Sequence, residues 1–433
     1  DTAGAGTDTA HSHSHSHADA GASAARAGAD PDAFGEVVRL CAGLPLAVCV
    51  AGALLAAGPR WPIKELATEL AGQQRRLAAL GVAEDIPVRA ALDVSYQALP
   101  PAAARLYRLL ALVPGPSFCP SLAAAATAVD ATHAHELLGT LTGASLLAQV
   151  GEGRFRFHDL VRLHAREQAL LEPPGEQHAG VARSVAWYLR AAVAADLVVI
   201  PGRWRLGPLY DQAALAPSAS ASPASKPPAS KPSAAAPTAA APPASTPSAS
   251  ARPAYGGPAE ALDWAESALP GLLAAVRAAY DEGLHEQAWQ LCEAMWGLFT
   301  HRKHYEQWIS AHELGVAAAT ACGDQRAQAR MRVQLGLAYL ELGEHAQART
   351  QFTRALELDR RAEHRLGEAT ALAQLGRADE ATGRTGAAIA AFSQARDIFD
   401  ELGAPDAADV RRRLRALGAG SPDSQRGGAA QAT

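Results

Sequence analysis

Apolar residues recur at helical spacing from about residue 34 onward. The first such run is Phe34, Val37, Val38 and Cys41. Pro31 stands where a helix that buries this run would begin, and Gly43 stands where it would end. The same pattern predicts helices from 46 to 57 and from about 62 to 80. Three short helices in succession predict a small helical bundle.

The next stretch mixes helical and strand-like patterns. Helices are expected at 88–98, 101–112, 121–128 and 133–143. Two strand-like runs, 146–150 and 154–157, follow on either side of Gly-Glu-Gly, and a further helix begins at Asp159. Helices followed by a hairpin predict a winged-helix lobe. Beyond it, residues 176–199 read as one more amphipathic helix.

Residues 216–256 are almost entirely Ala, Pro and Ser, which is typical of a linker that buries nothing. Residues 1–30 likewise lack apolar content, and we expect them to be disordered. The same expectation holds for the tail, 419–433.

A repeat follows the linker. Its first copy is Leu335-Gly336, Tyr339, Gly343, Ala348, Phe352 and Ala355, and its second is Leu375-Gly376, Asp379, Gly383, Ala388, Phe392 and Ala395. This order of small and large residues is that of the tetratricopeptide repeat, but the period of forty predicts longer helices than usual. A looser match near Trp296-Gly297 and Phe299 indicates a divergent earlier copy. Further helices are expected at 258–281, 284–299 and 405–417.

These patterns predict a mainly α fold: a helical subdomain and a winged-helix lobe, then a tetratricopeptide-like α-solenoid. The expected segments are 1–30 disordered, 31–84 helical subdomain, 85–172 winged-helix lobe, 173–215 helical connector, 216–256 linker, 257–418 repeat array and 419–433 tail.

Composition excludes some classes of function. The net charge of −5 over 433 residues creates no global field that would draw the chain to nucleic acid or to a membrane. The longest apolar run, 44–57, is too short to span a bilayer, and no signal peptide is evident. The five cysteines include no Cys-x-x-Cys pair and lie in apolar patterns, so we expect buried thiols in a cytoplasmic protein. Because the chain starts with Asp1, we expect a fragment or a processed product.

Two short motifs carry candidate chemistry. In Cys41-Ala-Gly-Leu-Pro-Leu-Ala47, Gly43 permits a sharp turn, Pro45 fixes the next helix start and Leu44 anchors the joint. Taken alone, this motif reads as a structural joint between two helices.

The second motif is Arg156-Phe-His-Asp-Leu160. Asp159 is placed to cap the following helix, which puts His158 where an imidazole can reach an anion. A histidine beside a cap is the structural alternative.

Together and in this order, the motifs resemble the Gly-Leu-Pro-Leu and Met-His-Asp motifs of the NB-ARC family, the switch ATPases of apoptosomes and plant disease-resistance proteins. The bacterial branch of large AfsR-like Streptomyces antibiotic regulators is the most similar. Further stretches that carry the resemblance are Val88–Tyr96, Arg105–Leu110, Trp187–Leu189 and Gln307–Leu314, so that it covers roughly 31–215 and 256–403.

The resemblance implies that Pro45 lies against adenine, with Gly43 and Leu44 beside it, and that His158 contacts the β-phosphate of ADP. Asp159 would orient the loop of His158. Phe157 stands where the family has Met, which an apolar anchor position should tolerate.

The family's phosphate cradle and metal site are not found. The sequence has no Gly-x-x-x-x-Gly-Lys-Ser/Thr motif, and no apolar strand ends in paired acids. We therefore expect no enzymatic activity, no catalytic residues and no metal site in this chain. ADP or ATP is expected to bind the full-length parent, and neither is expected to bind tightly to this chain alone.

Two other readings are weaker. His11, His13, His15 and His17 alternate with Ser and could chelate a divalent ion if extended, although a drifting low-complexity tract is the better explanation. The winged-helix lobe has as many acids as arginines and no lysine, unlike a DNA reader.

We therefore expect the C-terminal part of a nucleotide-dependent signalling switch and transcriptional regulator. The repeats, 257–418, would bind a protein partner, the parent can self-associate, and DNA would be reached only through an upstream domain. Two alternatives remain: a stand-alone repeat scaffold without nucleotide function, and a fragment that docks on a separate P-loop chain.

Overall fold

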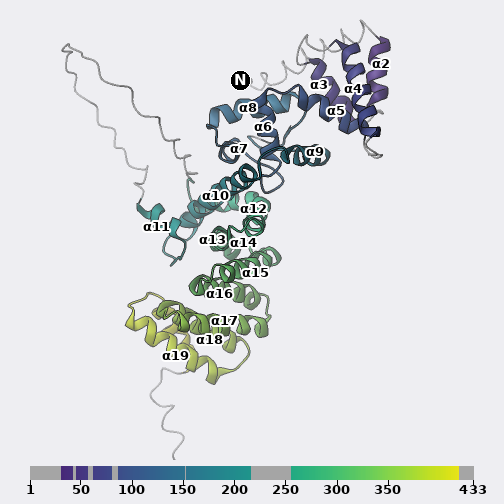
Figure 1. Ribbon diagram of the computed structural model, residues 1–433. Coiled ribbons are helices and arrows are strands. Elements are labelled where there is room, and N and C mark those ends of the chain that lie inside the picture. The colour runs from purple at the N-terminus through teal and green to yellow at the C-terminus, as the bar shows by residue number, and fades with distance from the viewer. Residues whose placement is uncertain are drawn as a thin grey trace, which may run out of the picture. The chain divides into compact units, whose positions relative to one another are not determined.

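Helices dominate the computed structural model, which describes residues 31–41, 45–56, 62–79, 86–151, 153–215 and 255–418 (Figure 1). The mainly α fold expected from the sequence is confirmed. The chain divides into two compact units, one ending at Ser184 and one beginning at Val185, and the division falls inside one long helix. The predicted linker and both predicted disordered ends lie outside the described residues, apart from Tyr255 and Gly256.

The first unit opens with four helices: α2 (Pro31–Leu40), α3 (Pro45–Ala56), α4 (Ile63–Ala79) and α5 (Ile86–Gln97). Proline occupies the first position of α2 and of α3, where its missing N–H costs nothing. α5 packs against α3 and α4, and their shared core includes Val50, Leu54 and Leu66.

The rest of the unit contains α6 (Pro101–Leu110), α7 (Pro120–Thr127), α8 (Ala131–Gly143), β1 (Ala148–Gln149), β2 (Phe155–Arg156) and α9 (Asp159–Ala169). The predicted hairpin is present, and its antiparallel strands pair Ala148 with Arg156. The turn has Gly151 and Gly153 at positive φ, which explains the glycines of the sequence. The strands are shorter than predicted, although a bridge from Phe118 to Phe155 extends the sheet.

α10 (Pro174–Val199) passes from the first unit into the second, and α11 (Pro208–Leu215) follows it. The sequence predicted α10 but not α11, which is only eight residues long and has no strong apolar period.

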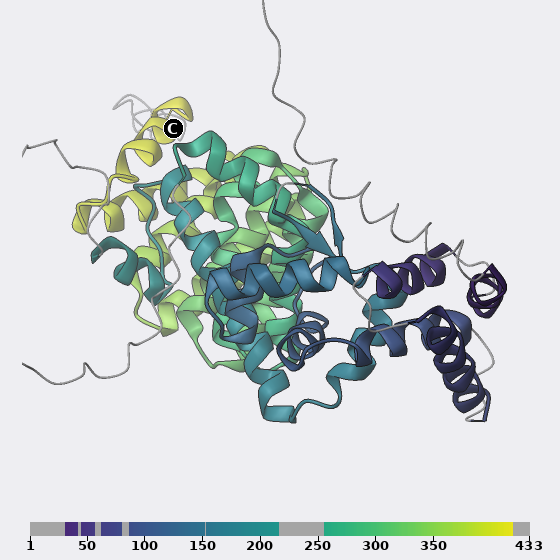
Figure 2. The ribbon, with the colours of Figure 1, turned by 90° about the horizontal axis from the view of Figure 1, so that it is seen from above.

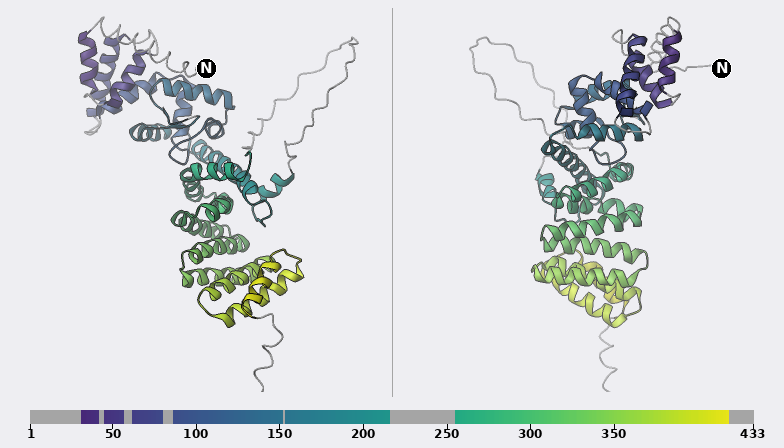
Figure 3. Two further views of the ribbon diagram at one scale, coloured as in Figure 1. Left: turned by 180° about the vertical axis from the view of Figure 1, so that it is seen from behind. Right: turned by 45° about the vertical axis from the view of Figure 1, so that its right-hand side comes forward.

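The second unit continues with α12 (Pro258–Asp281), α13 (His285–Ala294), α14 (Trp296–Arg302), α15 (Tyr305–Ala321), α16 (Gln325–Glu341), α17 (His345–Arg361), α18 (Arg365–Ala381), α19 (Thr385–Glu401) and α20 (Ala407–Ala416). Figure 3 shows these helices layered in successive antiparallel pairs, and in the view from above in Figure 2 they overlap. The predicted solenoid is therefore confirmed. The single helix expected at 284–299 is wrong, because the backbone at Met295 (ψ 0°) breaks it into α13 and α14.

Two helices and two turns make up the period of forty. Each of α16, α17, α18 and α19 has 17 residues, and three-residue turns separate them. Each turn places one residue at positive φ, so that such residues recur every twenty positions: Gly283, Lys303, Gly323, Gly343, Glu363, Gly383 and Gly403. The longer helices expected from the period are thus present.

Small residues let paired helices approach, as the repeat pattern predicted. A Cβ added to Gly336 would lie 2.5 Å from the Phe352 ring, and one added to Gly376 would lie 2.7 Å from the Phe392 ring. Both rings are fully buried. The glycine–phenylalanine pair is therefore the contact that joins the two helices of each repeat.

The cysteine expectation holds only in part. Cys41 and Cys292 are buried free thiols, but Cys49 and Cys322 are exposed. Apolar neighbours in the sequence did not show whether a cysteine lies on the buried or on the exposed face of its helix.

Gly336→Ala should destabilise the protein by about 1–3 kcal/mol, because the new methyl group must push the Phe352 ring out of a filled core. Thermal unfolding followed by circular dichroism measures the effect. Gly386→Ala in α19 is the matched control, since its Cβ would meet nothing within 4 Å, and its melting temperature should be unchanged or slightly higher. Equal melting temperatures for the two variants would contradict close packing at Gly336.

Candidate functional site

The first predicted nucleotide motif is only partly described. Gly43 and Leu44 lie outside the described residues, as does the side chain of Leu46. Pro45 is the first residue of α3 and is exposed. Its ring is accessible to a flat ligand, while the helix behind it is anchored by the buried residues Ala47 and Val50.

The second motif lies at the start of α9. His158 is the N-cap residue (φ −67°, ψ 149°), and its side chain makes no capping hydrogen bond. Asp159 is the first helical residue and not the cap, so the predicted capping role of Asp159 is wrong: its backbone has already entered the helix. From this position the negative charge of the carboxylate stabilises the helix through a favourable interaction with the helix dipole.

The side chains of His158 and Asp159 are exposed, and neither hydrogen-bonds to another side chain among the described residues. Phe157 beside them is 5% exposed and packs edge-on against Tyr107, with ring centroids 5.5 Å apart. The apolar anchor predicted at Phe157 is therefore present. It holds the backbone while the His158 imidazole faces solvent.

A buried polar network fixes α9 in place. The Tyr107 hydroxyl donates to the carbonyl oxygen of Val161 (3.1 Å) and is hydrogen-bonded to Nδ1 of His164 (2.8 Å). Nε2 of His164 in turn lies 2.9 Å from Oδ1 of Asp93. Burial raises the pKa of the Tyr107 hydroxyl, with smaller contributions from Tyr96 and Asp93, so the phenol stays protonated.

Ion pairs reinforce the same helix. Arg108 donates to Tyr96 (2.6 Å) and to Glu172 (2.8 Å), just beyond the end of α9. Arg89 of α5 pairs with Glu167 of α9. Sequence analysis singled out the stretches that contain Asp93 and Tyr107 but missed His164, because nothing local shows that its partners lie on two other helices.

The second unit holds a cluster of buried charges that the sequence did not reveal. Asp196 on α10 accepts from Arg203 (2.8 Å), Arg205 (2.9 Å) and Tyr210 (3.0 Å). Glu293 on α13 accepts hydrogen bonds from two backbone amides of the same loop, those of Leu206 and Gly207. The only signal was an Arg-Trp-Arg run between two helices, beside isolated acids on apolar helices.

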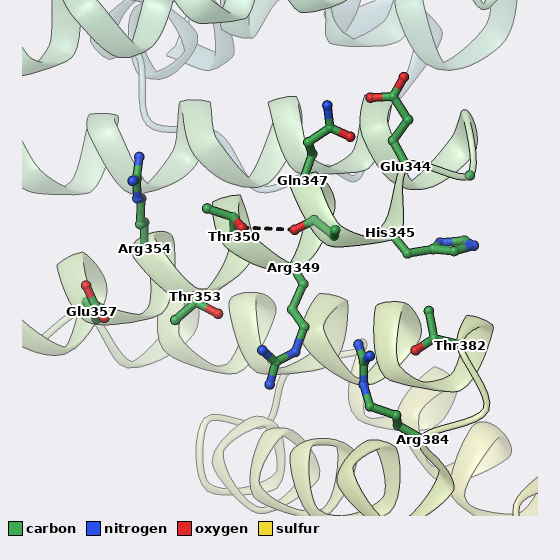
Figure 4. Close-up of a pocket in the computed structure, with 12 residues that line it drawn as sticks. Glu344, His345, Gln347, Arg349, Thr350, Thr353, Arg354, Glu357, Thr382 and Arg384 are labelled. Carbon is green, nitrogen blue, oxygen red and sulfur yellow. Dashed lines mark hydrogen bonds between the residues drawn. The ribbon is translucent and has the colours of Figure 1, made fainter.

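A hollow of about 930 Å³ lies along α17 (Figure 4). Arg349 and Arg384 line it, and both point to Asp379, at 3.2 and 2.9 Å from Oδ1. Arg354, Glu344 and Glu357 also line the hollow, so its walls carry charges of both signs.

The remaining sequence predictions on ligands concern metals and membranes. Among the described residues, no three His, Cys, Asp or Glu side chains are grouped as metal ligands, and the histidine tract lies outside them. None of the described helices has the length and apolar character needed to cross a membrane.

Comparison with known proteins finds two relatives that are named as regulatory proteins. It is similar to the regulatory protein AfsR of Streptomyces griseus, with 31% identity over 377 residues, which cover 84% of this chain and 35% of that protein. It is also similar to AfsR of Streptomyces coelicolor, with 41% identity over 174 residues, which cover 39% of this chain and 17% of that protein. The chain thus spans about a third or less of the length of these relatives. The similarity confirms the resemblance drawn from the motifs.

The repeats match the tetratricopeptide repeat family over residues 327–401. Among solved structures, the chain is similar to a signal transduction ATPase with numerous domains that has a tetratricopeptide repeat sensor, from Pyrococcus horikoshii. That match has 14% identity and a TM-score of 0.24, and it covers 86% of this chain and 61% of the other.

Tyr107→Phe should lower the free energy of unfolding by about 1–3 kcal/mol, because it leaves the buried His164 without one hydrogen-bond partner. Urea unfolding followed by circular dichroism measures the loss. Tyr339→Phe is the matched control, since its hydroxyl makes one long, exposed contact with Glu313 (3.4 Å), and its stability should change by less than about 0.5 kcal/mol. An equal loss of unfolding free energy in the two variants would contradict the claim that this network holds α9.

Proposed function

We propose that this AfsR-like chain is the adenine-side and sensor part of an ADP/ATP-dependent signalling switch that regulates transcription. The observation that carries the proposal is similarity to AfsR regulators over 84% of the chain. The ordered motifs around Pro45 and His158 and the repeats that follow agree with it.

The nucleotide role rests on His158. Its imidazole is exposed at the N-cap of α9, where the free N–H groups of the first turn and the helix dipole favour an anion. The Tyr107–His164–Asp93 network holds the helix, and Phe157 holds the loop. The backbone from which the His158 imidazole extends is therefore held in one position. A β-phosphate is the anion that the family resemblance implies.

The phosphates of the nucleotide need more than His158. The sequence has no P-loop motif, so residues outside it would supply the cradle and the metal site. In this proposal ADP keeps the parent closed, and a partner at the repeats releases it for exchange with ATP. The DNA-binding function would belong to a further domain of the parent.

A second candidate function is a protein-binding scaffold that ignores nucleotide. The match of residues 327–401 to the tetratricopeptide repeat favours it, because the repeats need no nucleotide to fold or to bind. Nucleotide titration distinguishes the two candidates.

In a protein that joins this chain to a phosphate-binding lobe, His158→Ala should weaken ADP binding roughly ten- to a hundredfold. A charge-assisted hydrogen bond to phosphate is worth about 1.5–3 kcal/mol. Isothermal calorimetry measures the affinity. His135→Ala on α8, equally exposed, is the matched control and should bind ADP like the wild type.

Two results would contradict the proposal. Unchanged affinity in the His158→Ala protein would make His158 a structural residue beside the helix. Tight ADP binding by the present chain alone would show that it contains a phosphate site that the sequence does not reveal.

A further inference from the structure

The loop between α10 and α11 lies extended across the repeats. Residues 203–207 have no helix or strand structure of their own. They contact α13 through Glu293, α16 through Arg330 and the turn before α18 through His364. These helices are the first members of successive pairs, and in solenoid repeats such helices form an extended binding surface.

The repeats hold this segment largely by its main chain. Glu293 Oε1 accepts from the Leu206 amide and Oε2 from the Gly207 amide, each at 3.0 Å. Arg330 Nη2 donates to the carbonyl oxygen of Trp204 at 3.1 Å. A Cβ on Gly207 would lie 3.4 Å from Oε2 of Glu293, in van der Waals contact with it. Main-chain contacts of this kind bind an extended peptide with little dependence on its sequence.

Two side chains add specificity. The Trp204 ring lies under the Arg330 guanidinium, with 4.9 Å from Cζ to the ring centroid, and beside the His364 ring at 5.0 Å. Arg203 reaches the buried carboxylate of Asp196 (2.8 Å) and the main-chain carbonyl of Glu293 (3.0 Å). The site thus recognises an aromatic ring by cation–π contact and the preceding arginine by charge.

Both the loop and its site keep polar atoms without a partner. Nε of Arg330, on the repeats, is buried without a hydrogen-bond acceptor in the described structure, and so are Nε and Nη1 of Arg203 in the loop itself. The nearest carboxylate oxygen to Arg330 Nε is Oε1 of Glu293, at 3.5 Å. Burial, with the nearby charge of Arg203, lowers the pKa of Arg330 to about 10. A segment that offers one more acceptor would fit the same site better.

We propose that this surface binds an extended segment of a partner protein that carries tryptophan next to arginine. Residues 203–207 are its built-in occupant, and the partner displaces them. The proposal rests on the repeats being the interaction module of the proposed function, and it is independent of nucleotide. While the loop occupies the site, a partner cannot bind there. The apparent affinity of the partner is therefore its affinity for the open site multiplied by the fraction of time that the site is open.

The test uses a fluorescein-labelled peptide with the sequence of residues 200–209 and the full chain, with binding followed by fluorescence anisotropy. Trp204→Ala removes the cation–π contact with Arg330, which weakens the attachment of the loop to the repeats and raises the fraction of time that the site is open. The peptide should bind this variant about tenfold or more tightly than it binds the wild type. Trp187→Ala, which removes a half-buried ring elsewhere in the same unit, is the matched control and should behave like the wild type.

A second peptide with alanine in place of the tryptophan should not bind any of the chains. Failure of the first peptide to bind the folded Trp204→Ala chain, or equal binding of both peptides, would overturn the proposal. If Trp204→Ala does not fold, Leu206→Pro replaces it, because it removes one amide that Glu293 holds and keeps every charged group. Calorimetry with ADP is scored separately, so the peptide site and the nucleotide function can fail independently.

Discussion

A carboxylate buried among helices must be matched by donors, and Glu293 is the residue on which the second unit depends. Its side chain is fully buried, as is that of Asp196. Leaving such a charge without partners costs several kcal/mol, so each carboxylate strongly favours the state in which donors reach it. The loop at 203–207 provides two main-chain amides for Glu293 and two arginines for Asp196. The Tyr210 hydroxyl and the Gly297 amide also donate to Asp196. This pairing explains why the end of α10, the loop and the repeats fold as one unit.

The same pairing gives the loop two roles. It completes the core of the repeats, and it covers the surface that the first helices of the pairs present. The Trp204 ring and the main chain around it are recognised as a bound peptide would be, by Arg330 and Glu293. In the first unit, the Tyr107–His164–Asp93 network has a simpler role: it fixes α9, at whose start His158 faces solvent.

Local rules in the sequence predicted much of the fold. Proline at helix starts and glycine in turns predicted most helix bounds, and the limits of α12 match exactly those expected, 258–281. The repeat of forty predicted that Gly336 and Phe352 meet, because close helices need a small residue opposite a large one. Local rules failed at Met295, where the backbone breaks a predicted single helix, and at Asp159, which is the predicted first residue of α9 but not its cap. The charged clusters could not be predicted, since Arg203 and Glu293 are 90 residues apart and no sequence motif marks either of them.

Amide hydrogen exchange at Leu206 and Gly207 tests most directly whether Glu293 binds the loop to the repeats. Both amides lie outside any helix, yet we expect them to exchange roughly a hundredfold or more slowly than in an unstructured peptide, because Glu293 accepts from both. Exchange of both amides at the rate of an unstructured peptide would contradict the account, since the loop would then not be held on the repeats.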